Sequence, residues 1–263
     1  MHQSLLFVPA DRPERFDRAA ASGTNAAVID LEDAVQPDAK DAARANIATW
    51  LQQGGKAVVR INAMDTPWHT DDITLLAHPG IIAVMVPMVQ DAAALRSFIS
   101  ALPRPLPVIA LIETARGLWC LGDLVAVKGL TRLGFGSIDF QLDTGIEDED
   151  EGLLYARSRI VLASAMAGLE PPLDGVNVNL DDMTGLERDT ARARGLGFGG
   201  KLCIHPAQVE VVNRGFAASD AELDWARRVV DAATGAKGAI RLDGKLIDAP
   251  VVSRARRLLE TQA

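Results

Sequence analysis

The chain has 263 residues, 48% of them hydrophobic, and a formal net charge of −8. This length fits one large α/β domain or two small ones, and the hydrophobic content suffices for a sizeable core. The acidic balance argues against a nucleic-acid partner, because phosphate backbones bind cationic surfaces. The two cysteines, Cys120 and Cys203, show neither metal-ligand spacing nor a pairing pattern, which favours a reducing compartment. The N-terminal apolar stretch 5–10 is too short to span a membrane, so we expect a cytoplasmic protein without a membrane partner.

Short apolar runs alternate along the chain with segments of helical periodicity. Eight strands that alternate with helices predict a (β/α)8 TIM-type barrel. An open doubly wound sheet is the alternative, but no glycine-rich dinucleotide loop follows an early strand. The expected strands are 4–9, 26–33, 56–62, 80–87, 108–112, 131–135, 175–179 and 199–206. The clearest expected helices between them are 38–51, 91–101, 153–168 and 184–196.

The C-terminal part of the chain does not continue this alternation. Residues 220–233 have a strong helical pattern, 235–244 are expected to be flexible or a short hairpin, and a last helix follows Asp248 and ends near Leu259. We therefore expect a barrel over 1–215 and a helical extension over 216–263. Because the extension lies beyond the eighth strand, it must pack outside the barrel or on a neighbouring subunit.

Two acids each follow an apolar strand at its carboxyl end, Glu113 after the run 108–112 and Asp139 after the run 131–135. The carboxyl ends of barrel strands meet at one face, so we expect both carboxylates in one site. Burying a lone carboxylate is costly unless a cation meets it, and Mg²⁺ prefers few protein carboxylates and several waters. The pattern therefore predicts a Mg²⁺ site on these two residues. The alternative is that each acid caps the helix that follows it.

The third strand ends in Arg60, and the second runs into the acids Asp30, Glu32 and Asp33. A guanidinium can hold a carboxylate through two parallel hydrogen bonds, which lysine cannot imitate. We expect Arg60 to bind a substrate carboxylate while the acids orient metal-bound water or hold Arg60. A plain salt bridge from Arg60 to Glu32 or Asp33 is the alternative. The set suits a 2-oxo acid whose carbon–carbon bond forms or breaks beside a Lewis-acidic cation.

Six motifs occur in a fixed order over nearly the whole chain. They are SLLFVPADRPERF (4–16), IDLEDAV (29–35), VRIN (59–62), IET (112–114), FGSID (135–139) and GKLCIHPAQ (200–208). Together they resemble the citrate lyase β-subunit-like proteins and malyl-CoA lyases of the HpcH/HpaI aldolase superfamily. The resemblance implies a Mg²⁺-dependent carbon–carbon lyase that assembles as a homotrimer or homohexamer. Its reaction would cleave a malyl-, citramalyl- or citryl-type CoA thioester into an acyl-CoA and an oxo acid.

The resemblance also assigns roles to individual residues. It implies that Glu113 and Asp139 are the metal ligands and that Arg60 binds the oxo-acid carboxylate. Asp248 falls where the lyases carry an acid/base residue that is delivered from the adjacent subunit. The expected catalytic set is Arg60, Asp248, Glu32 and Asp33, and the expected substrate and CoA contacts are Phe7, Arg12, Arg18, Arg60, Ile138 and Asp139.

Three positions depart from the pattern of the family. Many relatives have an arginine where this chain has Gln3, and the fourth strand usually ends in Pro-Lys-Val and sometimes Glu, where this chain has Met88 and Gln90. These changes remove charges from the side that would bind an anionic thioester. Two alternatives therefore stay open: a class II aldolase for free 4-hydroxy-2-oxo acids, and a non-catalytic subunit that binds an acyl carrier.

Overall fold

The computed structural model describes residues 3–234 and 238–260. These residues form two compact units, which meet in the sequence between Phe216 and Ala217. In the part of the chain that is described, no helix combines the length and apolar character needed to cross a bilayer.

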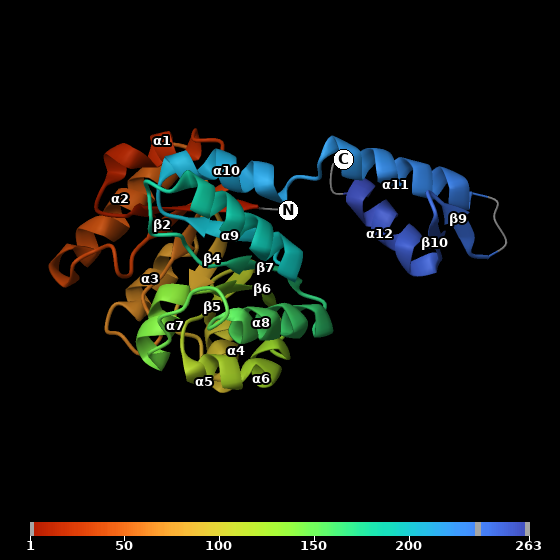
Figure 1. The fold of residues 1–263 in the computed structure, drawn as a ribbon. Helices are drawn as coiled ribbons and strands as arrows, with labels where there is room; N and C mark the ends of the chain where they lie inside the picture. Colours follow the sequence, from red (N-terminus) through yellow and green to blue (C-terminus); the bar gives the residue numbers. More distant parts are fainter. Residues whose placement is uncertain (1–2, 235–237, 261–263) are drawn as a thin grey trace. The chain divides into compact units, whose positions relative to one another are not determined.

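The N-terminal unit is a closed barrel of eight parallel strands that follow one another in sequence order. The barrel closes between β1 and β8, where Leu5 pairs with Leu202 and Leu6 with Cys203. This confirms the predicted TIM-type (β/α)8 fold, and Figure 1 shows helices arranged around the strands. The strands are β1 (Ser4–Pro9), β2 (Ala26–Asp30), β3 (Ala57–Arg60), β4 (Ile81–Val86), β5 (Val108–Ile112), β6 (Leu130–Phe135), β7 (Glu170–Asp174) and β8 (Gly200–Cys203).

The helices of this unit include the four that the sequence showed most clearly. Several others were not predicted, because five- to eight-residue helices carry too few turns for a periodic apolar pattern. The longer α10 was missed because its first residue, Pro206, was assigned to the preceding strand, although proline is favoured at the first helical position. The helices are α1 (Phe16–Ala20), α2 (Lys40–Gln52), α3 (His69–Leu75), α4 (Ala92–Ala101), α5 (Ala115–Trp119), α6 (Leu121–Val125), α7 (Ser137–Thr144), α8 (Leu154–Met166), α9 (Met183–Leu196) and α10 (Pro206–Phe216), with short 3-10 helices η1 (Pro13–Arg15) and η2 (Pro37–Ala39).

Alternation along the strands divides the apolar side chains between two cores. Leu5 and Leu202 belong to the cluster inside the barrel, whereas Leu6 and Cys203 belong to the cluster between the strands and the helices. The strands are buried on both faces, which explains why they appear in the sequence as unbroken apolar runs. Burial raises the pKa of the Cys203 thiol to about 12, as expected for a core cysteine that takes no part in chemistry.

The seventh strand was predicted in the wrong place. It comprises β7, Glu170–Asp174, and not residues 175–179. Two consecutive prolines, Pro171 and Pro172, suppress the strand signal because they lack backbone donors. Their carbonyls are nevertheless used: Pro171 accepts from Arg132 Nε at 2.7 Å, and Pro172 accepts from the backbone N–H of Gly199 at 2.9 Å.

The corrected strand ends in a buried charge cluster around Asp174. This carboxylate accepts from Arg157 Nε of α8 at 2.9 Å and from Lys201 Nζ of β8 at 3.0 Å. All three residues are almost inaccessible to solvent. The cluster therefore links two neighbouring strands to the helix outside them.

The C-terminal unit consists of α11 (Asp220–Ala233), a hairpin of β9 (Ile240–Leu242) and β10 (Lys245–Ile247), and α12 (Ala249–Glu260). Ala226, Val229, Ile247 and Ala255 form its small core. The segment expected to be flexible or a hairpin is a hairpin from residue 240 onward, and its residues 235–237 lie outside the described part. The use of this unit as a lid on a neighbouring subunit stays a prediction.

We predict that Asp174→Asn lowers the free energy of unfolding by about 3–5 kcal/mol, because it leaves two cations buried without an anion. Urea denaturation measures this change. The exposed pair of Arg214 and Glu187, 2.7 Å apart, provides the control. Glu187→Gln should cost no more than about 1 kcal/mol, as is usual for surface ion pairs. Equal losses in the two variants would contradict the importance of the cluster.

The same cluster predicts a pH dependence of stability. Burial alone would raise the pKa of Asp174, but Lys201 and Arg157 outweigh it and hold the pKa below its ordinary value of 3.8. The stability that this group contributes is therefore fully present above the unfolded-state pKa and is lost as the pH falls below it. Acid unfolding curves of Asp174→Asn should show a shallower loss in this range than wild type.

Candidate active site

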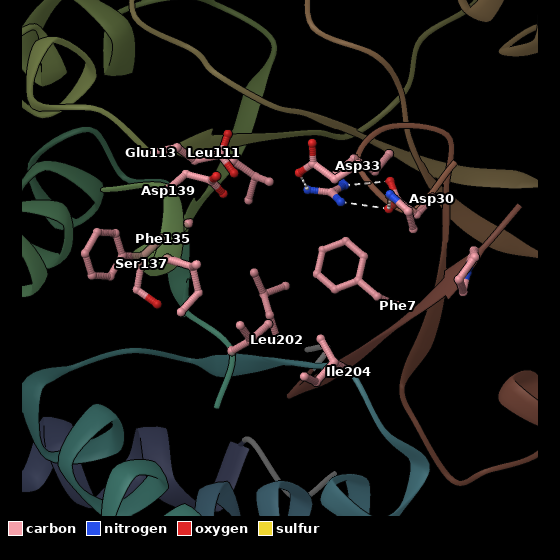
Figure 2. Close-up of a pocket in the computed structure, with 16 residues that line it drawn as sticks. Phe7, Asp30, Asp33, Leu111, Glu113, Phe135, Ser137, Asp139, Leu202 and Ile204 are labelled. Carbon is pink, nitrogen blue, oxygen red and sulfur yellow. Dashed lines mark hydrogen bonds and ion pairs between the residues drawn. The ribbon is translucent and has the colours of Figure 1, made fainter. Parts of the chain in front are cut away.

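A cavity of about 380 Å³ opens at the carboxyl ends of the barrel strands. Figure 2 shows Glu113 and Asp139 on one side of it and Asp33 on the other, with Phe7 and Ile204 below them in this view. Barrel active sites lie at this face, because the loops after the strands converge there. Of the predicted site residues, the cavity collects Phe7, Asp33, Arg60, Glu113, Ile138 and Asp139.

Arg60 is the last residue of β3, and it forms a bidentate ion pair with Asp30, the last residue of β2. Arg60 Nε and Nη2 donate to the two carboxylate oxygens of Asp30, each at 2.7 Å. The strand register places the two residues opposite each other, so the pair follows directly from the pairing of β2 with β3. Glu32 Oε2 lies 2.8 Å and Asp33 Oδ2 3.5 Å from Arg60 Nη1. The acids thus hold Arg60 as expected, but Asp30 contributes the main contact.

The ring of Phe7 covers this guanidinium. The centre of the ring lies 4.8 Å from Arg60 Cζ, a distance at which a cation is attracted to an aromatic face. Phe7 comes from β1, so residues of three consecutive strands fix the orientation of Arg60.

Glu113 follows β5 directly and is buried, whereas Asp139 lies half-buried in the first turn of α7. Neither caps a helix. Thr114 caps α5 by accepting from the N–H of Gly117, and the N-cap of α7 is Gly136, which has no side chain. The alternative that both acids are helix caps is therefore wrong. No cation among the described residues forms an ion pair with either carboxylate.

More carboxyl groups than cationic side chains line or adjoin the cavity. Burial raises the pKa of Glu113 to about 7 even though a hydrogen bond from Met88 lowers it. Burial likewise raises the pKa of Asp139 and raises that of Glu32 to about 9, where Arg60 offsets only part of the effect. Burial alone would lower the pKa of Arg60, but Asp30 and Glu32 raise it overall, so the guanidinium stays charged. The site therefore has room for a further positive charge.

Two predicted contact residues lie elsewhere in the N-terminal unit. Arg18 lines an adjoining cavity of about 420 Å³, which shares Phe7 with the first one and also contains His205. Arg12 is more than half exposed, lies 3.9 Å from Asp11 and lines neither cavity. The backbone carbonyl of Gln3 accepts a hydrogen bond from the backbone N–H of Lys201 at 2.7 Å. This contact does not involve the Gln3 side chain.

Asp248 lies in the C-terminal unit. Its Oδ1 accepts from the N–H of Val251 at 3.3 Å, and its backbone carbonyl accepts from Val252 N at 3.0 Å. This is the arrangement of a helix N-cap, so the capping role considered from the sequence is present. A catalytic role for Asp248 in another subunit stays a prediction.

The contact that Met88 makes in the site was not predictable from the sequence. Its backbone φ is 52°, in the left-handed region that side chains other than glycine seldom adopt, and its N–H donates to Glu113 Oε2 at 2.6 Å. The position that departs from the family pattern thus contributes through its backbone. Gln90 Oε1 lies 3.3 Å from Thr114 Oγ1, in the segment that follows Glu113.

The fold and the site define a (β/α)8-barrel enzyme with an acidic cavity at the carboxyl ends of its strands. The family model described as HpcH/HpaI aldolase/citrate lyase matches residues 3–206, so the chain belongs to this family and is an enzyme of the lyase class. The resemblance found in the sequence is confirmed.

Similar proteins cover almost the whole chain. The citrate lyase subunit beta-like protein of Deinococcus radiodurans is 35% identical over an alignment of 280 positions, which covers 99% of this chain and 97% of that protein. A (3S)-malyl-CoA thioesterase of Cereibacter sphaeroides is 32% identical, with coverage of 98% and 93%. The crystal structure of CitE from Mycobacterium tuberculosis in complex with magnesium, acetoacetate and coenzyme A matches with a TM-score of 0.84. Its sequence identity is 34%, and the match covers 98% of this chain and 97% of that one.

We predict that Gly136→Ala disturbs Glu113, because a Cβ at this position would overlap Glu113 Cγ and Oε1. Displacing a buried side chain should lower the free energy of unfolding by about 1–3 kcal/mol, as in other overpacked sites. A crystal structure of the variant should show Glu113 detached from the N–H of Met88.

Gly195→Ala is the matched control, since a Cβ there meets nothing within 4 Å. This helical substitution should raise the free energy of unfolding by about 0.5–1 kcal/mol. An unchanged Glu113 position and stability in Gly136→Ala would show that the glycine is not required for the site.

Proposed function

We propose that this chain is a Mg²⁺-dependent carbon–carbon lyase that acts on a malyl-, citramalyl- or citryl-type CoA thioester and releases an acyl-CoA and an oxo acid. The observation that carries the proposal is the pair Glu113 and Asp139. They are two buried or half-buried carboxylates that face one cavity beside Arg60.

The residues fit a Mg²⁺ ion. Among the residues that the structure describes, no three His, Cys, Asp or Glu side chains are grouped to hold a metal, so a cation would rest on two carboxylates. This suits Mg²⁺, which keeps several waters and open positions for substrate oxygens. The pKa values that burial raises in Glu113 and Asp139 point the same way, because a divalent cation would offset the excess negative charge. When bound, Mg²⁺ supplies Lewis acidity that stabilises negative charge on the oxo-acid oxygens.

Arg60 would bind the carboxylate of the oxo acid. A guanidinium has five N–H donors, and the side-on pair with Asp30 uses two of them. Nη1 lies 2.8 Å from Glu32 and 3.5 Å from Asp33, and Arg60 lines the cavity together with Asp33, so a substrate carboxylate would compete with these acids for the remaining donors. Asp30 and Phe7 fix the plane of the guanidinium, so a substrate carboxylate would meet a preorganised donor pair.

The relatives support the identity of the substrates. The related CitE structure holds magnesium, acetoacetate and coenzyme A, which together comprise a metal, an oxo acid and an acyl carrier. The acyl carrier would lie at the adjoining cavity, where Arg18 lies near Phe7.

Thioester hydrolysis is the second candidate, since a (3S)-malyl-CoA thioesterase is among the similar proteins. The two reactions give different products. A lyase yields an acyl-CoA and an oxo acid, whereas a thioesterase yields a free hydroxy acid and the CoA thiol.

A panel of malyl-, citramalyl- and citryl-CoA, assayed for oxo acid and for free thiol, tests the proposal. We expect oxo acid without free thiol, and its loss in Glu113→Gln and Asp139→Asn. Mg²⁺ affinity, measured by calorimetry, should fall at least about tenfold in both variants, since the loss of even an outer-shell partner of a metal ligand lowers metal affinity that much. Free thiol without oxo acid would favour the thioesterase. Cleavage of free 4-hydroxy-2-oxo acids alone would favour a class II aldolase, and binding of an acyl carrier protein without turnover would favour a non-catalytic subunit.

We also predict that Asp248 acts as an acid/base group in the site of a neighbouring subunit of a homotrimer or homohexamer. A proton must leave or join the acyl carbon, and Glu113 and Asp139 would both be engaged with the metal. Asp248→Asn and Arg60→Ala should each be inactive as homo-oligomers, and reassembled mixtures should regain part of the activity. Mixed oligomers proven by mass spectrometry but inactive would count against delivery from a neighbour. Full activity of Asp248→Asn would leave this residue with its capping role alone.

A further inference from the structure

Lys40 is a buried cation whose three hydrogen bonds go to neutral oxygens, and its Nζ also lies 5.1 Å from the centre of the Trp68 ring. It opens α2 and is 4% exposed. Its Nζ donates to the backbone carbonyls of Leu31 at 2.6 Å and Glu32 at 2.7 Å, and to Asn62 Oδ1 at 2.7 Å. An ammonium has three donors, so these three acceptors satisfy it completely. Burying a charge in this way is costly, and a purely apolar side chain would fill the space without that cost.

The oxygens that Lys40 binds belong to the loop that carries the acids of the site. Residues 31–33 follow β2, and Asp30 ties the same loop from the other side by accepting from Glu32 N at 2.9 Å. With both carbonyls fixed, the peptide planes at positions 31 and 32 cannot rotate freely. The side chain of Glu32 then meets Arg60 Nη1 at 2.8 Å.

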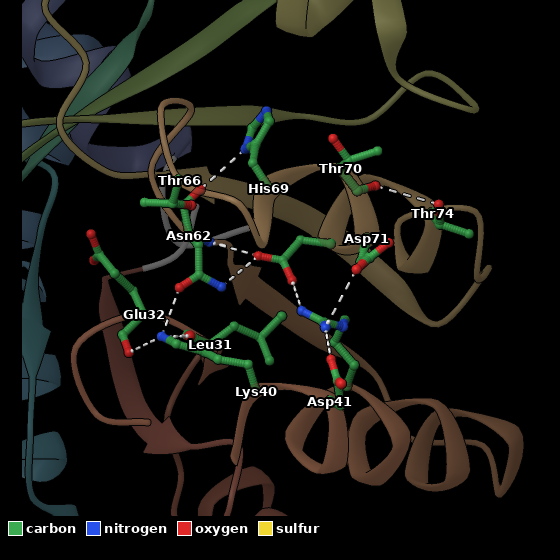
Figure 3. Close-up of polar contacts among 12 residues, drawn as sticks. Leu31, Glu32, Lys40, Asp41, Asn62, Thr66, His69, Thr70, Asp71 and Thr74 are labelled. Atoms are coloured by element: carbon green, nitrogen blue, oxygen red, sulfur yellow. Dashed lines mark hydrogen bonds and ion pairs between the residues drawn. The ribbon is translucent and has the colours of Figure 1, made fainter. Parts of the chain in front are cut away.

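A chain of polar contacts in turn holds Lys40 in place (Figure 3). Asn62 donates from its backbone N–H and from Nδ2 to Asp72 Oδ2, at 2.8 and 2.7 Å. These bonds orient the amide so that its oxygen faces Lys40. Asp72 is fully buried and accepts from Arg44 Nη1 at 2.9 Å. Asn62 lies two residues beyond Arg60, so Lys40 bridges the segments that follow β2 and β3.

We propose that Lys40 is a positioning residue, which fixes the loop 31–33 so that Glu32 and Asp33 hold Arg60 in its orientation toward the cavity. It acts through the loop and does not touch the substrate. The expected effect on substrate binding rests on the proposed function, in which Arg60 binds an oxo-acid carboxylate. The expected effect on the orientation of Arg60 is independent of that function.

The test compares Lys40→Met with Lys201→Met in the full-length protein. Both remove a buried ammonium of similar burial, but Lys201 pairs with Asp174 and has no contact with the acidic loop. In Lys40→Met the ¹H–¹⁵N signal of Arg60 Nε, assigned by its loss in Arg60→Lys, should shift or broaden. At saturating Mg²⁺ the Kd for pyruvate should rise at least about tenfold, as when a partner that orients a functional group is lost, while the Kd for Mg²⁺ stays within about twofold.

In Lys201→Met both the Arg60 signal and pyruvate binding should match wild type despite a lower melting temperature. An unchanged Arg60 signal in Lys40→Met, or equal changes in the two variants, would overturn the proposal and leave Lys40 with a role in stability alone. If Lys40→Met does not fold, Lys40→Gln, which keeps a shorter polar donor, is subjected to the same comparison. Absence of pyruvate binding in wild type would refute the proposed function, and the Arg60 signal would still decide the role of Lys40.

Discussion

The ion pair between Arg60 and Asp30 is the interaction on which the site depends. It joins the carboxyl ends of β2 and β3 through two hydrogen bonds of 2.7 Å and fixes the plane of the guanidinium at the edge of the cavity. Each partner is largely removed from water, so neither charge could be buried there without the other. Glu32, Asp33 and Phe7 add further contacts to the same guanidinium.

Charge balance links this pair to the rest of the cavity. Beside Arg60 stand more carboxylates than one guanidinium can neutralise, and burial raises the pKa values of Glu113, Asp139 and Glu32. Protons or a bound cation can supply the missing positive charge. Under the proposed function, a bound cation would let a protein with a net charge of −8 receive an anionic substrate, because the local potential would then differ from the net charge.

Several residues shape the site without contributing reactive groups. Met88, which has a left-handed backbone, donates its N–H to Glu113, and the missing side chain of Gly136 leaves the space that Glu113 occupies. A strained backbone conformation of this kind persists only where the contacts of the surrounding fold hold it in place. These two features explain how Glu113 is held in one orientation although no cation in the described part of the chain forms an ion pair with it.

The sequence by itself determined the eight-strand barrel, the residues at most strand ends and the family, because strands buried on both faces produce apolar runs and the candidate site residues follow them directly. It placed the seventh strand wrongly, since Pro171 and Pro172 hide the signal of β7. It also could not show that Arg60 pairs chiefly with Asp30, which depends on the register of β2 against β3. Nor could it show that Lys40 reaches the carbonyls of Leu31 and Glu32, which requires α2 to fold back over the end of β2. Only tertiary structure decides such contacts, because local sequence patterns specify elements and their faces but not the distances between side chains of different elements.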